Sequence, residues 1–283
     1  MVTNKATARP SKLRPFEIAA ICKVVREHSG VVLGEDKAYV VQNRLDMLAQ
    51  ELDFPTSRDL YVHMLQSKDQ RTTARIVDIL LTKETSFFRH PASFQALIKG
   101  VVPEVLRKSP SSTLRVWSAA CSAGQEPYSI SMALREAGLC QLDGRLDIYA
   151  TDISGMVLEQ ARMGRYSQVE VSRGLPVTLL LKYFKQNGHW WMLADQIRKP
   201  VRFHQHNLLE STSSVGRFDL IFCRNVGIYF NDEGKRHMVS RLVASLAPGG
   251  YLFLGASESA LRYSDALRHE QWENVIYYRI KDA

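Results

Sequence analysis

The chain has 283 residues, of which 45% are hydrophobic, so it holds enough apolar material for one large and one small domain, which excludes a wholly disordered protein. No stretch approaches the roughly 18–20 apolar residues of a membrane-spanning helix, and residues 1–14 lack the apolar run of a signal peptide. We therefore expect a soluble cytoplasmic protein.

The net charge of +8 is spread thinly along the chain. Residues 1–95 contain 14 Lys and Arg against 11 Asp and Glu, and the remaining residues contain 23 against 18, without a dense basic block in either part. Such a diffuse field favours an acidic partner and does not by itself indicate nucleic acid. The four cysteines lack CxxC spacing and a neighbouring His pair, so we expect no disulfide and no metal site. They are Cys22, Cys121, Cys140 and Cys223.

Residues 1–13 are polar and basic, which is typical of a flexible tail. Residues 14–90 carry four short helical patterns joined by short turns, which predict a small all-α helical bundle. The helices are expected to begin near Pro15, Asp36, Ser57 and Gln70, with Ser57 as an N-cap. The apolar positions that define them are Phe16, Ala19, Ala20, Cys22, Val25, Tyr39, Val40, Leu45, Leu48, Leu60, Tyr61, Met64, Leu65, Ile76, Val77, Leu80 and Leu81.

Residues 91–112 are expected to form a linker helix, and residues 113–283 alternate between short apolar runs and helical patterns. This alternation is typical of a doubly wound α/β sheet. An Asn187-Gly188 turn before Trp190 indicates a hairpin, so a small β-subdomain is expected as an insertion at about 164–199. The expected strands of the main sheet are 114–118, 146–151, 201–206, 218–223, 250–254 and 275–280. The turn at residues 246–250 is expected to precede the fifth of them.

Ligands bind to a doubly wound sheet at the carboxyl ends of its strands, and chemistry-bearing residues follow several of the expected strands here. The small residues 119–124 allow close approach of the backbone, as a degenerate Gly-rich loop does. Asp152 is placed to accept hydrogen bonds from ribose hydroxyls, although Asp152 or Ser154 suits a helix N-cap equally well. Asn207 and Asn225 suit an adenine edge or an amino-acid moiety, but Asn also favours ordinary turns. Together and in this order they indicate an adenosyl cofactor.

Three longer motifs narrow this interpretation. Residues 82–89 are TKETSFFR, residues 118–129 are SAACSAGQEPYS and residues 223–230 are CRNVGIYF. In this order they resemble the chemotaxis receptor methyltransferases of the CheR family, and the similarity extends from about residue 15 to 280. The resemblance implies a helical N-terminal domain that docks on the receptor, packed on a Rossmann-like domain that binds S-adenosylmethionine. It also implies methyl transfer to glutamate side chains on the cytoplasmic helices of chemoreceptors, in sensory adaptation.

By this resemblance, eight residues match cofactor contacts and two are candidates for catalysis. The cofactor contacts are Thr85, Arg89, Glu126, Asp152, Asn207, Leu208, Arg224 and Asn225, and the catalytic candidates are Arg89 and Tyr229. The sequence departs from the family at Lys83, where Asn is usual, so we do not carry that contact over. It also has Gln125 where Glu is common, Gly227 for a larger apolar residue and Asn231 for Asp.

The implied reaction explains why the sequence shows no catalytic triad. A glutamate carboxylate has an ordinary pKa near ~4.3, so it is an ionised nucleophile at neutral pH and needs no general base. The enzyme must align it with the methyl donor and exclude water, and such orientation can supply roughly 7–11 kcal/mol. Arg89 suits the steering of a carboxylate, either that of the glutamate or that of the cofactor. Phe87 and Phe88 are expected to anchor their segment in the core.

Two expectations concern the receptor. The family uses its β-subdomain to bind a C-terminal peptide tether of some receptors, and the Asn187-Gly188 turn is short beside the tether-binding members, so we predict independence from the tether. The helical domain is expected to dock on the receptor, with Arg44 and Lys37 approaching acidic methylation helices, although a solvated face is the plainer interpretation. We expect a monomer that binds no nucleic acid and does not insert into a membrane.

Two rival functions remain at this point. A nucleic-acid methyltransferase would suit the pI of 9.3, but the residues after 223 lack the proline-rich run of adenine N6 enzymes, and Cys223 lacks the preceding proline common at a cytosine C5 nucleophile. A non-enzymatic signalling module would keep the fold, with or without the cofactor, and Lys83 and the glycine-poor loop favour it.

Overall fold

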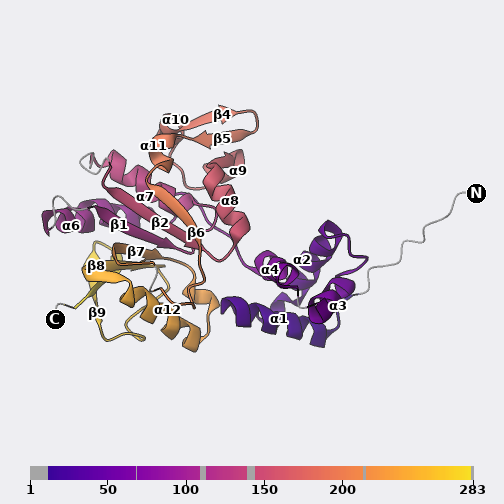
Figure 1. The fold of residues 1–283 in the computed structure, drawn as a ribbon. Coiled ribbons are helices and arrows are strands. Elements are labelled where there is room, and N and C mark those ends of the chain that lie inside the picture. The colour runs from indigo at the N-terminus through magenta and orange to yellow at the C-terminus, as the bar shows by residue number, and fades with distance from the viewer. Residues whose placement is uncertain (1–11, 68, 109–112, 139–143, 213–214, 282–283) are drawn as a thin grey trace, which may run out of the picture. The chain divides into compact units, whose positions relative to one another are not determined.

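The computed structural model describes residues 12–67, 69–108, 113–138, 144–212 and 215–281. The chain divides into two compact units, residues 1–82 and 83–283 (Figure 1). Residues 1–11 of the expected tail lie outside the described residues, as does Cys140. Among the described residues, no helix has both the length and the apolar character that crossing a membrane requires.

In its described part, residues 12–67 and 69–82, the first unit has four α-helices and one short 3₁₀ turn. The helices are α1 (Pro15–Ser29), α2 (Ala38–Glu51), α3 (Ser57–Ser67) and α4 (Gln70–Leu80), and the turn is η1 (Glu35–Lys37). The helix α1 begins with Pro15 and is followed by Gly30 at φ 75°, which are the start and stop signals expected there. The side chains buried between the helices include Ile21, Val25, Val41, Leu45, Leu48, Leu60, Met64, Ile76, Val77 and Leu80.

The structure corrects part of the expected core of this unit. Tyr39 and Val40 are 75% and 40% exposed, because the buried stripe of α2 follows Val41, Leu45 and Leu48 at i, i+4 and i+7 instead. Phe16 and Leu65 are also exposed, one on α1 and one on α3.

Two polar assignments in the first unit also differ from expectation. Ser57 is buried and its Oγ accepts a hydrogen bond from Gln42 at 2.9 Å, whereas Thr56 Oγ1 accepts the backbone N–H of Asp59 at 3.2 Å, as an N-cap does. Arg44 Nη1 donates to the carbonyl oxygens of Ile79 and Leu81 at 3.0 and 3.1 Å. Arg44 therefore satisfies carbonyls at the end of α4, which a helix leaves without partners.

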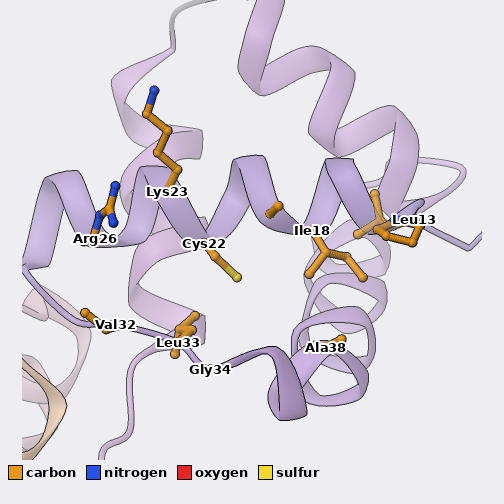
Figure 2. Close-up of a pocket in the computed structure, with 11 residues that line it drawn as sticks. Leu13, Ile18, Cys22, Lys23, Arg26, Val32, Leu33, Gly34 and Ala38 are labelled. Atoms are coloured by element: carbon orange, nitrogen blue, oxygen red, sulfur yellow. The ribbon is translucent and has the colours of Figure 1, made fainter.

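A pocket of about 610 Å³ lies between α1 and the segment that precedes α2. Leu13, Ile18 and Leu33 contribute to its apolar wall. Figure 2 shows Cys22 pointing from α1 toward Leu33, whereas Lys23 points to the other side of the helix.

The second unit opens with a helical segment that packs into its core. It consists of α5 (Pro91–Gln95), a π-helical stretch η2 (Ala96–Val101) and α6 (Val102–Lys108). Phe94, Leu97 and Val102 are buried in the hydrophobic cluster that also contains the first strands of the sheet. Phe87, before this segment, is 0% exposed, and its ring lies 4.9 Å from that of Tyr166, so its expected role as a core anchor is confirmed. These contacts explain why the second unit begins at Lys83, ahead of the boundary expected at residue 90.

Within the residues that the structure describes, the main sheet has seven strands in the order β6-β2-β1-β7-β8-β10-β9. Figure 1 labels all of these strands except β10. The first five are parallel, and β10 runs antiparallel to β8 and β9. The strands are β1 (Leu114–Ala119), β2 (Leu146–Asp152), β6 (Val201–Gln205), β7 (Phe218–Cys223), β8 (Leu246–Leu254), β9 (Leu267–Trp272) and β10 (Val275–Ile280). The helices that alternate with the parallel strands include α7 (Gln125–Glu136), α8 (Gly155–Met163) and α12 (Asp232–Ala244). The predicted α/β fold with a preceding helical bundle is confirmed.

Two features of this sheet were not expected. Strand β9 was missed, and β8 begins at Leu246, so residues 246–250 belong to the strand. The pairing of β8 with β7 is irregular there, because the register shifts between the pairs Phe218–Leu246 and Leu220–Tyr251, so residues 247–250 interrupt the ladder where the turn was expected. A Cβ on Gly250 would lie 2.9 Å from the carbonyl oxygen of Ala247 and 3.1 Å from that of Phe218. The glycine thus permits close approach of neighbouring backbone at the start of the strand.

The insertion forms a three-stranded antiparallel sheet in the order β3-β5-β4. Its strands are β3 (Arg165–Ser167), β4 (Phe184–Asn187) and β5 (Trp190–Leu193), and its helices are α9 (Gln168–Ser172), α10 (Val177–Tyr183) and α11 (Asp195–Arg198). The expected hairpin is present, with Asn187 paired to Trp190 across a two-residue turn. Gly188 occupies the first turn position at φ 58°, where a type II′ turn favours glycine.

Candidate functional site

The main sheet has its topological switch point between β1 and β7, because the chain proceeds from β1 to β2 and β6 on one side and from β7 to β8 on the other. The loop after β1 reaches this point. Ala120, Ser122 and Gly124 have φ values of 58°, 51° and 90°, so three alternate residues adopt a left-handed conformation. Such a conformation costs roughly 1–2 kcal/mol for a residue with a Cβ. The loop therefore holds a glycine-like shape with small residues, as strained functional loops do.

Asp152, at the end of β2, fastens this loop to the next helix. Its Oδ2 accepts the backbone N–H of Ser122 and its Oδ1 that of Ser154, each at 2.9 Å. Ser154 is the N-cap of α8, since its Oγ accepts the N–H of Val157. The N-cap interpretation thus belongs to Ser154, and Asp152 lies half-buried beside the loop that the cofactor would approach.

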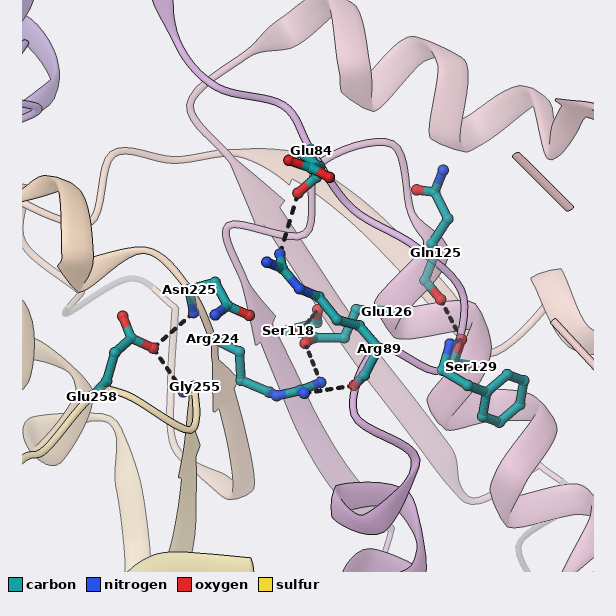
Figure 3. Close-up of polar contacts among 11 residues, drawn as sticks. Glu84, Arg89, Ser118, Gln125, Glu126, Ser129, Arg224, Asn225, Gly255 and Glu258 are labelled. Carbon is teal, nitrogen blue, oxygen red and sulfur yellow. Dashed lines mark hydrogen bonds and ion pairs between the residues drawn. The ribbon is translucent and has the colours of Figure 1, made fainter. Parts of the chain in front are cut away.

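Arg224, directly after β7, and Glu126, in the first turn of α7, form an ion pair with Nη1 and Oε2 3.3 Å apart. The side chains are 2% and 14% exposed. Ser118 Oγ donates to Glu126 Oε1 at 2.8 Å, and Arg224 Nη2 donates to the carbonyl of Arg89 at 2.6 Å (Figure 3). Burial raises the pKa of Glu126 although Arg224 opposes this, and burial lowers the pKa of Arg224.

The segment 83–90 is attached to the same loops by its backbone. Ser122 Oγ donates to the carbonyl of Lys83 at 3.0 Å, and the N–H of Phe88 donates to Ser129 Oγ at 2.9 Å. Phe88 and His90 have φ values of 46° and 57°, so the backbone is left-handed on both sides of Arg89. These contacts bring Arg89 to the Arg224–Glu126 pair.

Two of the predicted site residues lie farther from this pair in the sheet. Asn207 and Leu208 follow β6, an edge strand that is separated from β1 by β2. Asn207 Oδ1 accepts the N–H of Leu209 at 3.1 Å, which is the turn chemistry that Asn favours, and Leu208 is buried. Thr85 is half-buried in the segment 83–90.

Asn225 and Tyr229 follow β7 on the other side of the switch point. Asn225 has φ 60°, and its Oδ1 is buried without a hydrogen-bond partner among the described residues. Tyr229 ends the 3₁₀ turn η4 (Gly227–Tyr229) and is half-buried. The turn leads to α12, whose N-cap is Asn231, so the Asn in place of Asp keeps the capping role.

Three residues that shape the candidate site were not singled out from the sequence, namely Ser118, Ser129 and Glu258. The first two lie inside the motif at residues 118–129, but their partners come from other segments. Glu258 lies in the loop after β8, and its carboxylate accepts three backbone N–H groups, from Asn225, Val226 and Gly255. The strand-end rule would have indicated this loop, since β8 is the last parallel strand.

The donor set fits an adenosyl cofactor. The carboxylates of Asp152 and Glu126 suit hydroxyl and ammonium groups, and the unpartnered Asn225 Oδ1 is an acceptor that a bound ligand can satisfy, as buried polar groups require. No group of His, Cys, Asp and Glu side chains in the described ranges is arranged to hold a metal ion.

Fold and site together define an S-adenosylmethionine-dependent methyltransferase. Comparison with known families places the chain more narrowly: residues 83–276 match the SAM-binding domain of CheR methyltransferases, and residues 17–80 match their all-alpha domain. The chain belongs to the CheR methyltransferase family.

Relatives with assigned functions agree. Chemotaxis protein methyltransferase 1 of Pseudomonas aeruginosa is 41% identical over 256 residues, which cover 89% of this chain and 93% of the relative. Chemotaxis protein methyltransferase Cher2 of Pseudomonas putida is 40% identical over 256 residues, with the same coverage. The glycopeptide N-methyltransferase MtfA, solved with S-adenosylmethionine, matches 71% of each chain at 15% identity, and its TM-score of 0.34 supports no further argument. The chain is thus an S-adenosylmethionine-dependent methyltransferase of chemotaxis.

Proposed function

We propose that this enzyme methylates glutamate side chains on the cytoplasmic helices of chemoreceptors and so forms the glutamyl methyl esters of sensory adaptation. The observation that carries this proposal is the position of Arg89. It lies on the segment 83–90, beside the other guanidinium of the site, that of Arg224, whose two terminal nitrogens already donate to Glu126 and to the Arg89 carbonyl.

The two guanidinium groups differ in what they can still bind. Arg224 is buried and donates to Glu126 and to the Arg89 carbonyl. Arg89 is half-buried, and its side chain makes a single long contact among the described residues, from Nη1 to the Glu84 carbonyl at 3.3 Å. A guanidinium has five N–H donors in a fork that matches a carboxylate, so Arg89 retains the donors to receive one.

The chemistry requires orientation more than proton transfer. S-adenosylmethionine supplies, when bound, a methyl group on a cationic sulfur, and this sulfur serves as the leaving group by departing as a neutral thioether. Asp152, Asn225 and Glu126 would hold the cofactor by hydrogen bonds, and Thr85, Asn207, Leu208 and Arg224 are the further residues proposed to line or support it. Arg89 would align the incoming carboxylate, and Tyr229 would present its hydroxyl beside that carboxylate. No residue need act as a general base, because the acceptor carboxylate is already ionised.

The rival cytosine C5 chemistry is disfavoured by the state of Cys223. This residue is 0% exposed, and burial raises the pKa of its thiol well above the ordinary value, so a thiolate nucleophile is unfavourable there.

The proposed function is tested by methyl transfer from labelled S-adenosylmethionine to membranes that carry chemoreceptors from the same cell. The product label should be base-labile, as an ester is, and Arg89→Gln should lower transfer by about 100-fold or more through lost orientation. The matched control is Arg173→Gln, because Arg173 pairs with Glu84 at 2.7 Å between exposed side chains. Cofactor binding without base-labile label on any receptor would instead favour a signalling module.

We further propose that the enzyme acts without a receptor C-terminal pentapeptide tether. The support is the hairpin β4–β5, whose turn contains two residues, Gly188 and His189. Calorimetry with receptor C-terminal pentapeptides should show no binding, and micromolar affinity would contradict the proposal.

The helical unit is proposed to dock on the receptor, with the enzyme acting as a monomer. Arg44 donates to carbonyl oxygens inside the bundle, so of the two candidate cations Lys37 is the one proposed to approach the receptor. Lys37→Glu should raise the Michaelis constant for receptor without changing cofactor affinity.

A further inference from the structure

The loop that follows β7 takes its shape from a side chain in the loop that follows β8. Glu258 Oε2 accepts the backbone N–H of Asn225 at 2.7 Å and that of Gly255 at 2.6 Å, and Oε1 accepts the N–H of Val226 at 3.1 Å. Figure 3 shows the Glu258 carboxylate pointing at Asn225 and Gly255. A carboxylate is an acceptor only, so it satisfies several N–H donors that converge on one point.

This carboxylate compensates for an unfavourable backbone. Asn225 is left-handed at φ 60°, and its N–H and that of Val226 both turn toward Glu258. Charge-assisted hydrogen bonds of this kind are about twice as strong as neutral ones. The same conformation leaves Asn225 Oδ1 buried and without a partner among the described residues.

Space around the carboxylate is also limited. A Cβ on Gly255 would lie 2.5 Å from Glu258 Oε2 and 2.9 Å from Asn225 Nδ2. Gly255 must therefore remain without a side chain for Glu258 and Asn225 to keep their positions. On the other side, Arg224 directly precedes Asn225 and is held by Glu126.

We infer that Glu258 is a positioning residue for the methyltransferase reaction: it holds Asn225 in the orientation that receives the cofactor and touches neither cofactor nor acceptor itself. This inference rests on the proposed role of Asn225 in the cofactor site.

The test is Glu258→Gln in the full chain. An amide has one oxygen acceptor and one NH₂ donor, so its NH₂ group must face one of the backbone N–H groups that the carboxylate accepts. Two donors then oppose each other and that hydrogen bond is lost. Affinity for S-adenosylhomocysteine, measured by calorimetry, should fall about tenfold or more, as the loss of one good hydrogen bond implies. The kcat of methyl transfer should fall by about 100-fold through misplacement of the site, with little change in the Michaelis constant for receptor.

The matched control is Glu170→Gln. The Glu170 carboxylate also accepts a backbone N–H, that of Ser167 at 2.8 Å, but at the start of α9. This variant should lose comparable stability and keep the affinity for S-adenosylhomocysteine. Near-ultraviolet circular dichroism checks that both variants are folded.

A second variant, Gly255→Ala, keeps the charge of Glu258 but crowds both its carboxylate and the Asn225 side chain, and it should also lower the affinity. Unchanged affinity in both variants, or a loss no greater than that of Glu170→Gln, would overturn the inference. If the wild-type chain binds S-adenosylhomocysteine and methylates no receptor, the proposed function fails, while the binding comparison still decides the role of Glu258.

Discussion

Arg224 donates from one terminal nitrogen to the Glu126 carboxylate and from the other to the carbonyl of Arg89, so one buried guanidinium joins the strand end of β7, the start of α7 and the segment 83–90. Its partners are 98 and 135 positions away in the sequence. The Arg224–Glu126 ion pair therefore links three segments of the fold, in addition to being part of the candidate cofactor site.

Removing one member of this pair should be costly. Glu126→Ala leaves the buried Arg224 without its counter-charge, so we expect a loss of about 3 kcal/mol in the free energy of unfolding, measured by urea denaturation. Arg262→Ala breaks an ion pair between exposed side chains, with Asp232 at 3.1 Å, and should cost less than about 1 kcal/mol. Equal effects in the two variants would show that the Arg224–Glu126 pair is not buried as described.

His90 should titrate at lower pH than an ordinary histidine. Desolvation lowers the pKa of His90, and the nearby charges of Arg224 and Arg89 lower it further below 6.5. Between the lowered pKa of His90 in the folded chain and its ordinary pKa, the unfolded chain binds more protons than the folded chain. The contribution of His90 to stability is therefore lost as the pH falls through this range.

The measurement is an NMR titration of the His90 ring, together with urea unfolding between about pH 7 and 5. His90→Asn removes this part of the pH dependence and tolerates the left-handed backbone at φ 57°. A midpoint at or above 6.5 for His90 would contradict the expectation.

The cysteines should differ in reactivity. Burial raises the pKa of Cys121 and Cys223 well above the ordinary value, whereas Cys22 is only partly buried and lines the pocket beside α1. In a Cys140→Ser background, we expect a thiol reagent to modify Cys22 first and the other two only as fast as the chain opens. Peptide mapping after limited alkylation tests this order of modification, and labelling of Cys223 before Cys22 would contradict it.

Arg44 should act on stability rather than on cofactor binding. Arg44→Gln removes two hydrogen bonds to the carbonyls that end α4, so the helical unit should lose about 1–2 kcal/mol. The unfolding of the full chain is followed by circular dichroism, and S-adenosylhomocysteine affinity serves as the control. Unchanged stability with an altered Michaelis constant for receptor would restore Arg44 as a docking residue.

Much of the fold followed from patterns that are local in sequence. Strand β7 was predicted over its observed range because a short apolar run ends in turn-forming residues, and the helix from Pro15 was predicted from its own start and stop signals. The exposed Tyr39 and the buried Val41 show the limit of this approach: both are apolar, and only packing against the other helices decides which one faces inward.

The candidate site divides in the same way. Asp152 and Asn225 could be predicted as candidates because strand ends are local features, whereas Glu258 was not singled out because its carboxylate accepts three N–H groups, two of them more than 30 positions away. The left-handed backbone of Ala120 and Ser122 could not be predicted either, because neither alanine nor serine favours positive φ values.

The sequence by itself determined most of the order of helices and strands, though not β9, together with the family and the adenosyl cofactor, because these depend on periodicity and on motifs within a few residues of one another. Only the tertiary structure decided that Arg224 pairs with Glu126, that Arg44 ends a helix and that Glu258 supports Asn225. Hydrogen bonds and ion pairs act over about 3 Å, so their partners are set by the register of the strands and the packing of helices that bring distant segments together.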